Sequence, residues 1–205
     1  VPGASAELGQ YDYLVWGANH EQPTHWDYAN TKAILEDSAM ANTTVFGEVS
    51  VGVNVVNHSL TEVQTRIDQW KTAGAEGIFF NHFGYNWGAD RQRQNDAIQY
   101  AHDQNMLVLV EAFFPADAFG NAADPVHNPN GTPTVLNASD FYFYDAHQVA
   151  NGDIYAGFIW QDKADQLQTY RDSIDFGIFS YTTNNDSNVY DEAEFSYSYH
   201  SALLY

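Results

Sequence analysis

Short apolar segments alternate with longer amphipathic segments along the chain. This alternation is typical of parallel strands joined by crossover helices. The apolar segments predict six strands, at residues 11–17, 44–53, 76–82, 106–113, 141–145 and 176–181. The pattern therefore predicts an α/β fold built on a parallel sheet.

The clearest helix signals lie between the second and third predicted strands. Ser59 and Glu62 have the spacing of a capping box, and Gly74 is of the residue type that commonly ends a helix. Between them, apolar residues recur at helical spacing. Further helices are predicted from Asp90 onward, over 162–173, and from Asp191 toward the end of the chain.

The length of the chain bears on how complete the fold is. With 205 residues, of which 44% are hydrophobic, the chain can bury one sizeable core, and no shift in composition divides it. We predict a linker over 1–10, one domain over 11–205, and a surface loop over 115–139. A closed eight-stranded α/β barrel usually needs about 250 residues. We therefore expect the last strand to lie beyond residue 205.

Strand parity selects four polar residues that would face the inside of such a barrel. Alternate residues of a strand point to opposite faces, which places Glu48, Asn81, Glu111 and Asp145 inward, near the carboxyl ends of their strands. Glycoside hydrolysis needs two such carboxyl groups, one as proton donor and one as nucleophile or base. Alternatively, Glu48 and Glu111 are hydrogen-bonded interior carboxylates without catalytic roles. Asp145 is the stronger candidate because it directly ends a strand.

Five segments of the chain together resemble a known family. They are VFGEVSVGVN, LTEVQTRIDQWKTAGAEGIFFNHFGYNWGADRQRQN, MLVLVEAFFPADAFG, FYFYDAHQVANGDIY and WQDKADQLQTYRDS. They resemble the glycoside-hydrolase-like TIM barrels related to the spherulin-4 and endo-galactosaminidase group, over most of residues 11–205. A version of this domain occurs in tail-fibre and other structural proteins of tailed viruses. The resemblance implies a (β/α)8-type TIM barrel that lacks its last strand in the residues shown.

The resemblance also indicates where the family's chemistry would lie. In the relatives the third strand reads approximately GIFLDE, followed by GYDY, with acidic residues at the strand end. Here Asn81 and His82 occupy the matching positions, and Asn86 stands where the later aspartate would be. An amide cannot act as a general acid, base or nucleophile. Asp145 matches a position that is usually acidic. The expected function is therefore a degenerate hydrolase barrel that binds glycans rather than cleaving them.

The remaining polar and aromatic residues near the third strand are of the types that bind glycans without cleaving them. Amides offer donors and acceptors to sugar hydroxyls, and aromatic rings stack on sugar rings. The candidate glycan-binding residues are Asn81, His82, Tyr85, Asn86, Trp87 and Trp16. With 16% aromatic residues, some of these rings are equally expected in the core. The alternative function is an active extracellular glycosidase on an amino-sugar polysaccharide, which would pair Asp145 with Glu111 or Glu48.

Composition restricts the partners and the setting. The formal net charge is −20, from 27 acidic and 7 basic residues spread along the chain, which disfavours nucleic acid and anionic membranes and favours a halophilic origin. No apolar run is long enough to insert into a membrane. Acceptor sequons begin at Asn42, Asn57, Asn130, Asn137 and Asn185, which favours an extracellular or virion surface.

The most economical hypothesis is a tail-fibre or spike domain. Its expected partners are a host surface glycan or polysaccharide and other virion proteins, and it is expected to form a homo-oligomer. No glycine-rich phosphate loop, nucleophile elbow or metal-binding spacing occurs in the sequence, so no cofactor and no metal are expected.

Overall fold

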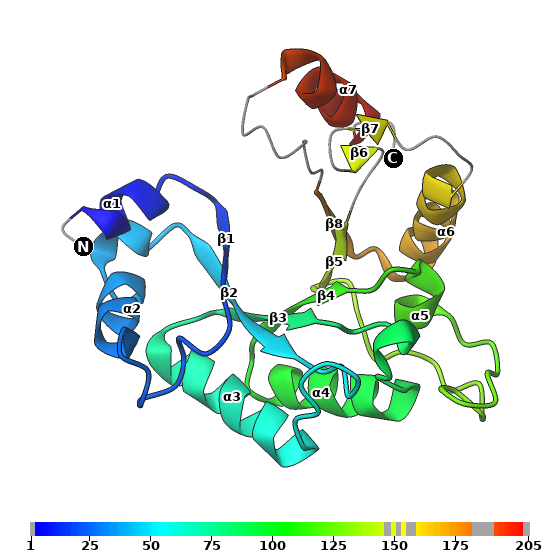
Figure 1. The fold of residues 1–205 in the computed structure, drawn as a ribbon, viewed down its shortest axis with the longest axis horizontal. Coiled ribbons are helices and arrows are strands. Elements are labelled where there is room, and N and C mark those ends of the chain that lie inside the picture. Colours follow the sequence, from blue (N-terminus) through cyan, green and yellow to red (C-terminus); the bar gives the residue numbers. More distant parts are fainter. Residues whose placement is uncertain (1–2, 146–148, 151–152, 155–158, 182–190, 203–205) are drawn as a thin grey trace.

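Six parallel strands form one sheet in the order β1-β2-β3-β4-β5-β8. The computed structural model describes residues 3–145, 149–150, 153–154, 159–181 and 191–202. The strands are β1 (Tyr13–Trp16), β2 (Thr44–Ser50), β3 (Gly77–Asn81), β4 (Leu107–Glu111), β5 (Phe141–Tyr144) and β8 (Gly177–Ser180). They curl into a half-barrel with helices on its outside (Figure 1). All six predicted strands are confirmed, each a little shorter than the pattern indicated.

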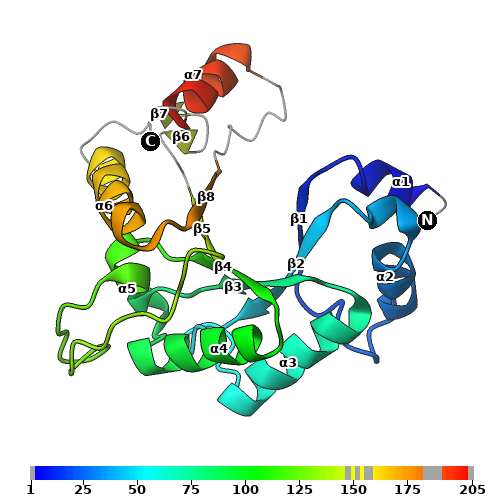
Figure 2. The same ribbon diagram turned by 180° about the vertical axis from the view of Figure 1, so that it is seen from behind.

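Within the described ranges, helices lie between the strands of the sheet, with one further helix before β1 and one after β8. They are α1 (Ala4–Leu8), α2 (Tyr28–Leu35), α3 (Leu60–Ala73), α4 (Arg91–Asp103), α5 (Pro115–Phe119), α6 (Ile159–Ile174) and α7 (Glu192–Ala202), with short 3-10 turns η1 (Ser38–Met40) and η2 (Tyr85–Trp87). Figure 1 and, from behind, Figure 2 show α3 and α4 side by side against the sheet. None of the helices in the described part of the chain has the length and apolarity needed to cross a membrane.

Several elements were not predicted from the sequence: α1 lies within the expected linker over 1–10, and α2 lies in a stretch for which no helix was predicted. The connection over 115–139 was expected to be loop throughout, but its first turn is α5, which begins with Pro115. Proline suits this position because the first helical residue needs no N–H donor. A short antiparallel pair of strands, β6 (Val149–Ala150) and β7 (Asp153–Ile154), was also not predicted. Two-residue strands leave no periodicity to detect.

Local capping signals fix the ends of the two central helices. Ser59 accepts a hydrogen bond at Oγ from the backbone N–H of Glu62 at 3.1 Å, and Gly74 ends α3 in the left-handed conformation, with φ of 109°. Asp90 caps α4 through the N–H of Arg93 at 2.8 Å. Only half of the predicted capping box forms, because the Glu62 carboxylate binds Arg66 instead of the backbone.

The alternation of side chains predicted for the strands is confirmed on the outer face. Val45, Val49, Ile78 and Phe80 pack in the core between the sheet and its helices. At Gly47 a Cβ atom would lie 2.1 Å from Cδ2 of Trp70, so only glycine allows the Trp70 ring to lie flat against β2. The Trp70 indole donates to the carbonyl of Glu48 at 3.0 Å.

Aromatic rings fill the inner face of the curled sheet. The inner cluster comprises Phe46, Phe79 and Leu109, with Leu107, Phe141, Phe143 and Phe179 packed against them. Tyr13 of β1 and Phe179 of β8 lie 4.9 Å apart between ring centroids, although these are the first and last strands of the sheet. The curl is therefore tight enough for side chains of its two edge strands to meet.

Candidate functional site

The strand register brings the predicted polar residues to one end of the half-barrel. Ser50 of β2 pairs with Asn81 of β3, and Phe80 pairs with Val110, so that Glu111 lies level with Asn81 on the next strand. Glu48 lies one inward-facing position below this level, beside Phe79. The convergence of Glu48, Asn81 and Glu111 at the carboxyl ends follows from this register.

Glu48, Asn81 and His82 form one hydrogen-bonded array. The Asn81 amide donates from Nδ2 to Oε1 of Glu48 at 2.8 Å, and its Oδ1 accepts the backbone N–H of His82 at 2.7 Å. The second Glu48 oxygen, Oε2, accepts the backbone N–H of Ala18 at 3.3 Å. The nitrogen and the oxygen of the Asn81 amide both have partners, and so do both oxygens of the Glu48 carboxylate. The array therefore holds these side chains in one orientation.

His82 has an unusual backbone conformation at the end of β3. Its φ is +55°, in the left-handed region that residues other than glycine visit rarely. In this conformation the imidazole Nδ1 lies 3.1 Å from the hydroxyl of Ser50, and the ring meets Trp87 edge-on at 4.8 Å. Burial lowers the pKa of His82, with an opposing contribution from the Glu48 carboxylate. The imidazole is therefore neutral near pH 7 and can donate or accept one hydrogen bond toward a ligand.

Glu111, the last residue of β4, interacts electrostatically with Asp145, which directly follows β5. Burial, and then the negative charge of Asp145, raise the pKa of Glu111 to about 7, although the backbone N–H of His82 and the charge of Lys163 oppose the rise. Asp145 itself is exposed, directly after the end of β5. A partly protonated carboxyl group thus lies within electrostatic reach of a solvated one, which is the environment of an acid and base pair.

Lys163 of α6 completes the charges around this pair. Its side chain is buried, and its Nζ lies 3.5 Å from the centre of the Phe113 ring and 5.9 Å from that of Phe114. Burial lowers the pKa of Lys163, whereas Asp145 and then Glu111 oppose the fall. A cation against an aromatic face is stabilised by the ring quadrupole, which compensates part of the lost hydration.

The aromatic candidates occupy different surroundings. Trp87 lies against His82, whereas the Tyr85 ring stacks on His127 with centroids 5.0 Å apart and planes at 9°. Asn86, between them in η2, is exposed. Trp16 packs against the core on the helix side of the sheet and edge-on to His20, so it lies outside the inner face.

Some groups at the site could not be identified from the sequence. Ser50, Lys163 and the N–H of Ala18 reach the site through tertiary packing. Strand parity could have indicated Ser50 alone, because it lies two residues after the inward-facing Glu48. Asp117 accepts the Tyr85 N–H at 3.0 Å from a segment that was expected to be loop. Among the described residues, no group of three or more His, Asp or Glu side chains is arranged to hold a metal ion.

The fold is similar to that of solved glycoside hydrolases. No protein-family model and no curated protein matches the sequence significantly. The glycoside hydrolase domain of PelA from Pseudomonas aeruginosa superposes with a TM-score of 0.53 at 15% identity, over 87% of this chain and 79% of that one. A mutant O-GlcNAc hydrolase from Thermobaculum terrenum gives a TM-score of 0.48 at 12% identity, over 93% of this chain and 44% of that one. At such identities the PelA match shows a glycoside-hydrolase-like fold.

Proposed function

We propose that the chain is a carbohydrate-binding domain that holds a glycan at the carboxyl ends of its strands. The observation that carries this proposal is the array of Glu48, Asn81 and His82, whose orientations are fixed before any ligand arrives. Fixed donors and acceptors beside an aromatic ring, here Trp87, are the groups that orient sugar hydroxyls and cover a sugar face. The glycoside-hydrolase-like fold supports a glycan as the ligand.

The same site favours glycan binding over hydrolysis, because hydrolysis by the proposed relatives' chemistry would need an acidic side chain at the end of β3. Asn81 supplies an amide where the proposed relatives have an acid, and its hydrogen bond engages one oxygen of Glu48. Glu48 receives a second donor from the backbone of Ala18. Both oxygens of Glu48 are therefore already held by protein donors, which suits a residue that positions the neighbouring amide for a ligand.

Glu111 and Asp145 support a second candidate function, glycoside hydrolysis. With a pKa of about 7, Glu111 retains a proton at neutral pH that it could donate to the glycosidic oxygen. Asp145 would then act as nucleophile at the anomeric carbon or as base toward water, according to the separation of the two carboxyl groups. On this proposal the amides of β3 bind the sugar, and the chemistry takes place at β4 and β5.

One set of assays distinguishes the two candidates. Binding is measured by calorimetry on a panel of amino-sugar oligosaccharides, and turnover by release of reducing ends, in molar salt. Recognition alone predicts binding without turnover, and loss of binding in Glu48→Gln. Hydrolysis predicts turnover that disappears in both Glu111→Gln and Asp145→Asn. Asp103→Asn, an exposed carboxylate on α4, is the matched control. The absence of both binding and turnover would falsify the carbohydrate proposal.

Turnover by the variant Asn81→Asp tests separately whether the barrel has lost a catalytic acid at β3. This substitution restores a carboxyl group at the position where the proposed relatives have an acid. Turnover that appears only in this variant would show that the barrel is a hydrolase inactivated at β3. Its pH profile would then report the new carboxyl group and not Glu111.

The setting that we propose for this function is a tail fibre or spike on an extracellular or virion surface in a halophilic system, as part of a homo-oligomer with other virion proteins. Its support is the net charge of −20 and the resemblance of the chain to barrels found in tailed viruses. We also propose that the half-barrel belongs to an eight-stranded TIM-type barrel. If the origin is halophilic, the melting temperature rises between about 0.1 M and about 3 M NaCl, because salt screens the self-repulsion of the surface. A melting temperature that does not change contradicts halophily and leaves glycan binding intact.

A further inference from the structure

A row of rings that the site described above does not use starts at Trp16, the last residue of β1, and continues along the loop between β1 and α2, residues 17–27. Trp16, His20, His25 and Trp26 follow one another, with centroids 6.4 Å, 4.4 Å and 5.5 Å apart. The row ends in Trp26, a residue that is 85% exposed. A tryptophan left almost wholly in water gives up the free energy that its burial would contribute.

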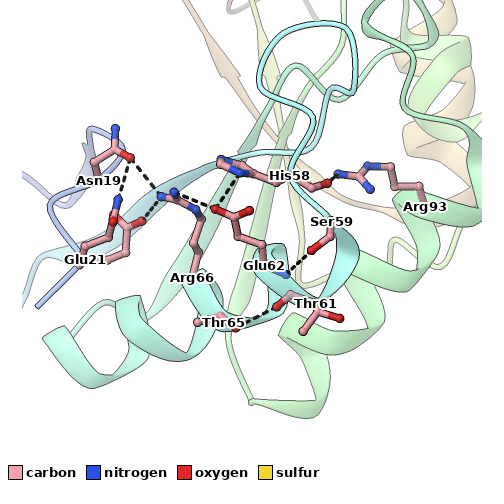
Figure 3. A network of polar contacts seen from close by, with 10 residues as sticks. Asn19, Glu21, His58, Ser59, Thr61, Glu62, Thr65, Arg66 and Arg93 are labelled. Carbon is pink, nitrogen blue, oxygen red and sulfur yellow. Dashed lines mark hydrogen bonds and ion pairs between the residues drawn. The ribbon is translucent and has the colours of Figure 1, made fainter. Parts of the chain in front are cut away.

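A buried ion pair holds this loop against α3. Glu21 has no exposed surface, and its Oε1 lies 2.6 Å from Nη1 of Arg66. The same guanidinium binds Asn19 of the loop at 3.1 Å and Glu62 of α3 at 3.2 Å (Figure 3). Burial raises the pKa of Glu21, and the positive charge of Arg66 opposes the rise. The loop is thus anchored at its centre by the contact of Glu21 with Arg66 in the second turn of α3.

Two backbone turns connect the anchored centre of the loop to Trp26. The N–H of His25 donates to the carbonyl of Gln22 at 2.8 Å, and the N–H of Tyr28 donates to the carbonyl of His25 at 3.1 Å. The second bond closes a turn around Trp26. Its exposed position is therefore set by the fold of the loop.

A hydrogen-bond donor lies beside the exposed indole. Nδ1 of His25 accepts the backbone N–H of Asp27 at 3.3 Å, so the ring proton of the neutral imidazole is on Nε2. His20 is fixed behind it by a contact of 3.3 Å between Nδ1 and the hydroxyl of the buried Thr31. An aromatic face with a fixed N–H donor next to it suits a sugar ring, which has an apolar face and a rim of hydroxyl groups.

The loop is continuous with the proposed glycan site. Its first residues include Ala18, whose N–H donates to the Glu48 carboxylate. From this geometry we propose that Trp26 and His25 form an outlying subsite, in which one sugar ring of a longer glycan stacks on the indole while another occupies the site at Glu48 and Asn81. This inference rests on the proposed carbohydrate binding, and it specifies the ligand as an oligosaccharide that spans more than one sugar.

The test compares short and long ligands in the same variants. Calorimetric titrations use the dimer and the hexamer of N-acetylglucosamine, followed by the equivalent oligomers of N-acetylgalactosamine. Trp26→Ala is expected to weaken binding of the hexamer about tenfold, the worth of one aromatic stacking contact, and to leave the dimer unchanged. Trp26→Phe retains a ring and should recover part of the loss. Tyr11→Ala, an exposed aromatic residue outside the row, is the matched control.

The outcomes separate this inference from the proposal on which it rests. If Glu48→Gln abolishes binding of both oligomers while Trp26→Ala binds the hexamer as the wild type does, the subsite is wrong and the central site stands. If the wild type binds neither type of oligomer, both are overturned. Analytical ultracentrifugation of the same proteins tests whether a second copy of the chain, instead of a sugar, covers Trp26. Self-association that Trp26→Ala removes, with hexamer affinity unchanged, would identify the exposed ring as a contact between two copies of the chain and overturn the subsite.

Discussion

Replacing Glu111 by glutamine should stabilise the folded protein at alkaline pH and have little effect at acid pH. Burial and the charge of Asp145 raise the pKa of Glu111 from 4.5 to about 7. At about 1.4 kcal/mol for each tenfold change in proton affinity, this difference amounts to about 3 kcal/mol against the ionised form in the folded state. Glutamine keeps the shape of the side chain but carries no charge.

The sign follows from proton binding in the two states. Between pH 4.5 and about 7 the folded state binds the Glu111 proton and the unfolded state does not, so the unfolding free energy falls as the pH rises through this window. Below it the carboxyl group is neutral in both states and costs nothing. Above it the full penalty of about 3 kcal/mol is present in the wild type and absent in Glu111→Gln.

Urea unfolding at about pH 4, 6 and 8, followed by circular dichroism, measures this difference. The variant should unfold with nearly the same free energy as the wild type at the lowest pH and be more stable by about 3 kcal/mol at the highest. Glu7→Gln, which removes an exposed carboxylate from α1, controls for the loss of one negative charge. A difference between Glu111→Gln and the wild type that stays constant with pH would refute the reasoning, because a protonated, desolvated carboxyl group would then not exist.

Substitutions at three further positions test how the fold holds the site, and each is measured by the change in unfolding free energy in urea. Gly47→Ala should cost about 1–3 kcal/mol or more, because its Cβ would lie 2.1 Å from Cδ2 of Trp70, and an unchanged stability would mean that the ring can shift. Arg66→Met should cost about 3–5 kcal/mol, because it leaves Glu21 buried without its cation, whereas a loss below about 1 kcal/mol would show that the pair is effectively solvated. Ser59→Ala should cost about 1 kcal/mol through loss of the cap on α3, and Ser59→Gly should recover most of it.

The sequence was a reliable guide to elements whose signals are local. Parallel strands buried on both faces read as short apolar runs, and the caps at Ser59 and Asp90 act within one helical turn. The inward parity of Glu48, Asn81 and Glu111 also followed from the sequence, because side chains alternate strictly along a strand. A short helix such as α5 was missed because one turn gives no period to recognise.

The site's chemistry depends on distances that no local pattern contains. The sequence by itself determined the strands and the side chains that face inward, including the amide of Asn81. Only the tertiary structure decided that Asn81 donates to Glu48, that Lys163 approaches Glu111 from α6, and that burial raises the pKa of Glu111. The reason is physical: hydrogen bonds and desolvation depend on which groups the curl of the sheet and the packing of the helices bring together, across separations of 30 residues and more in the chain.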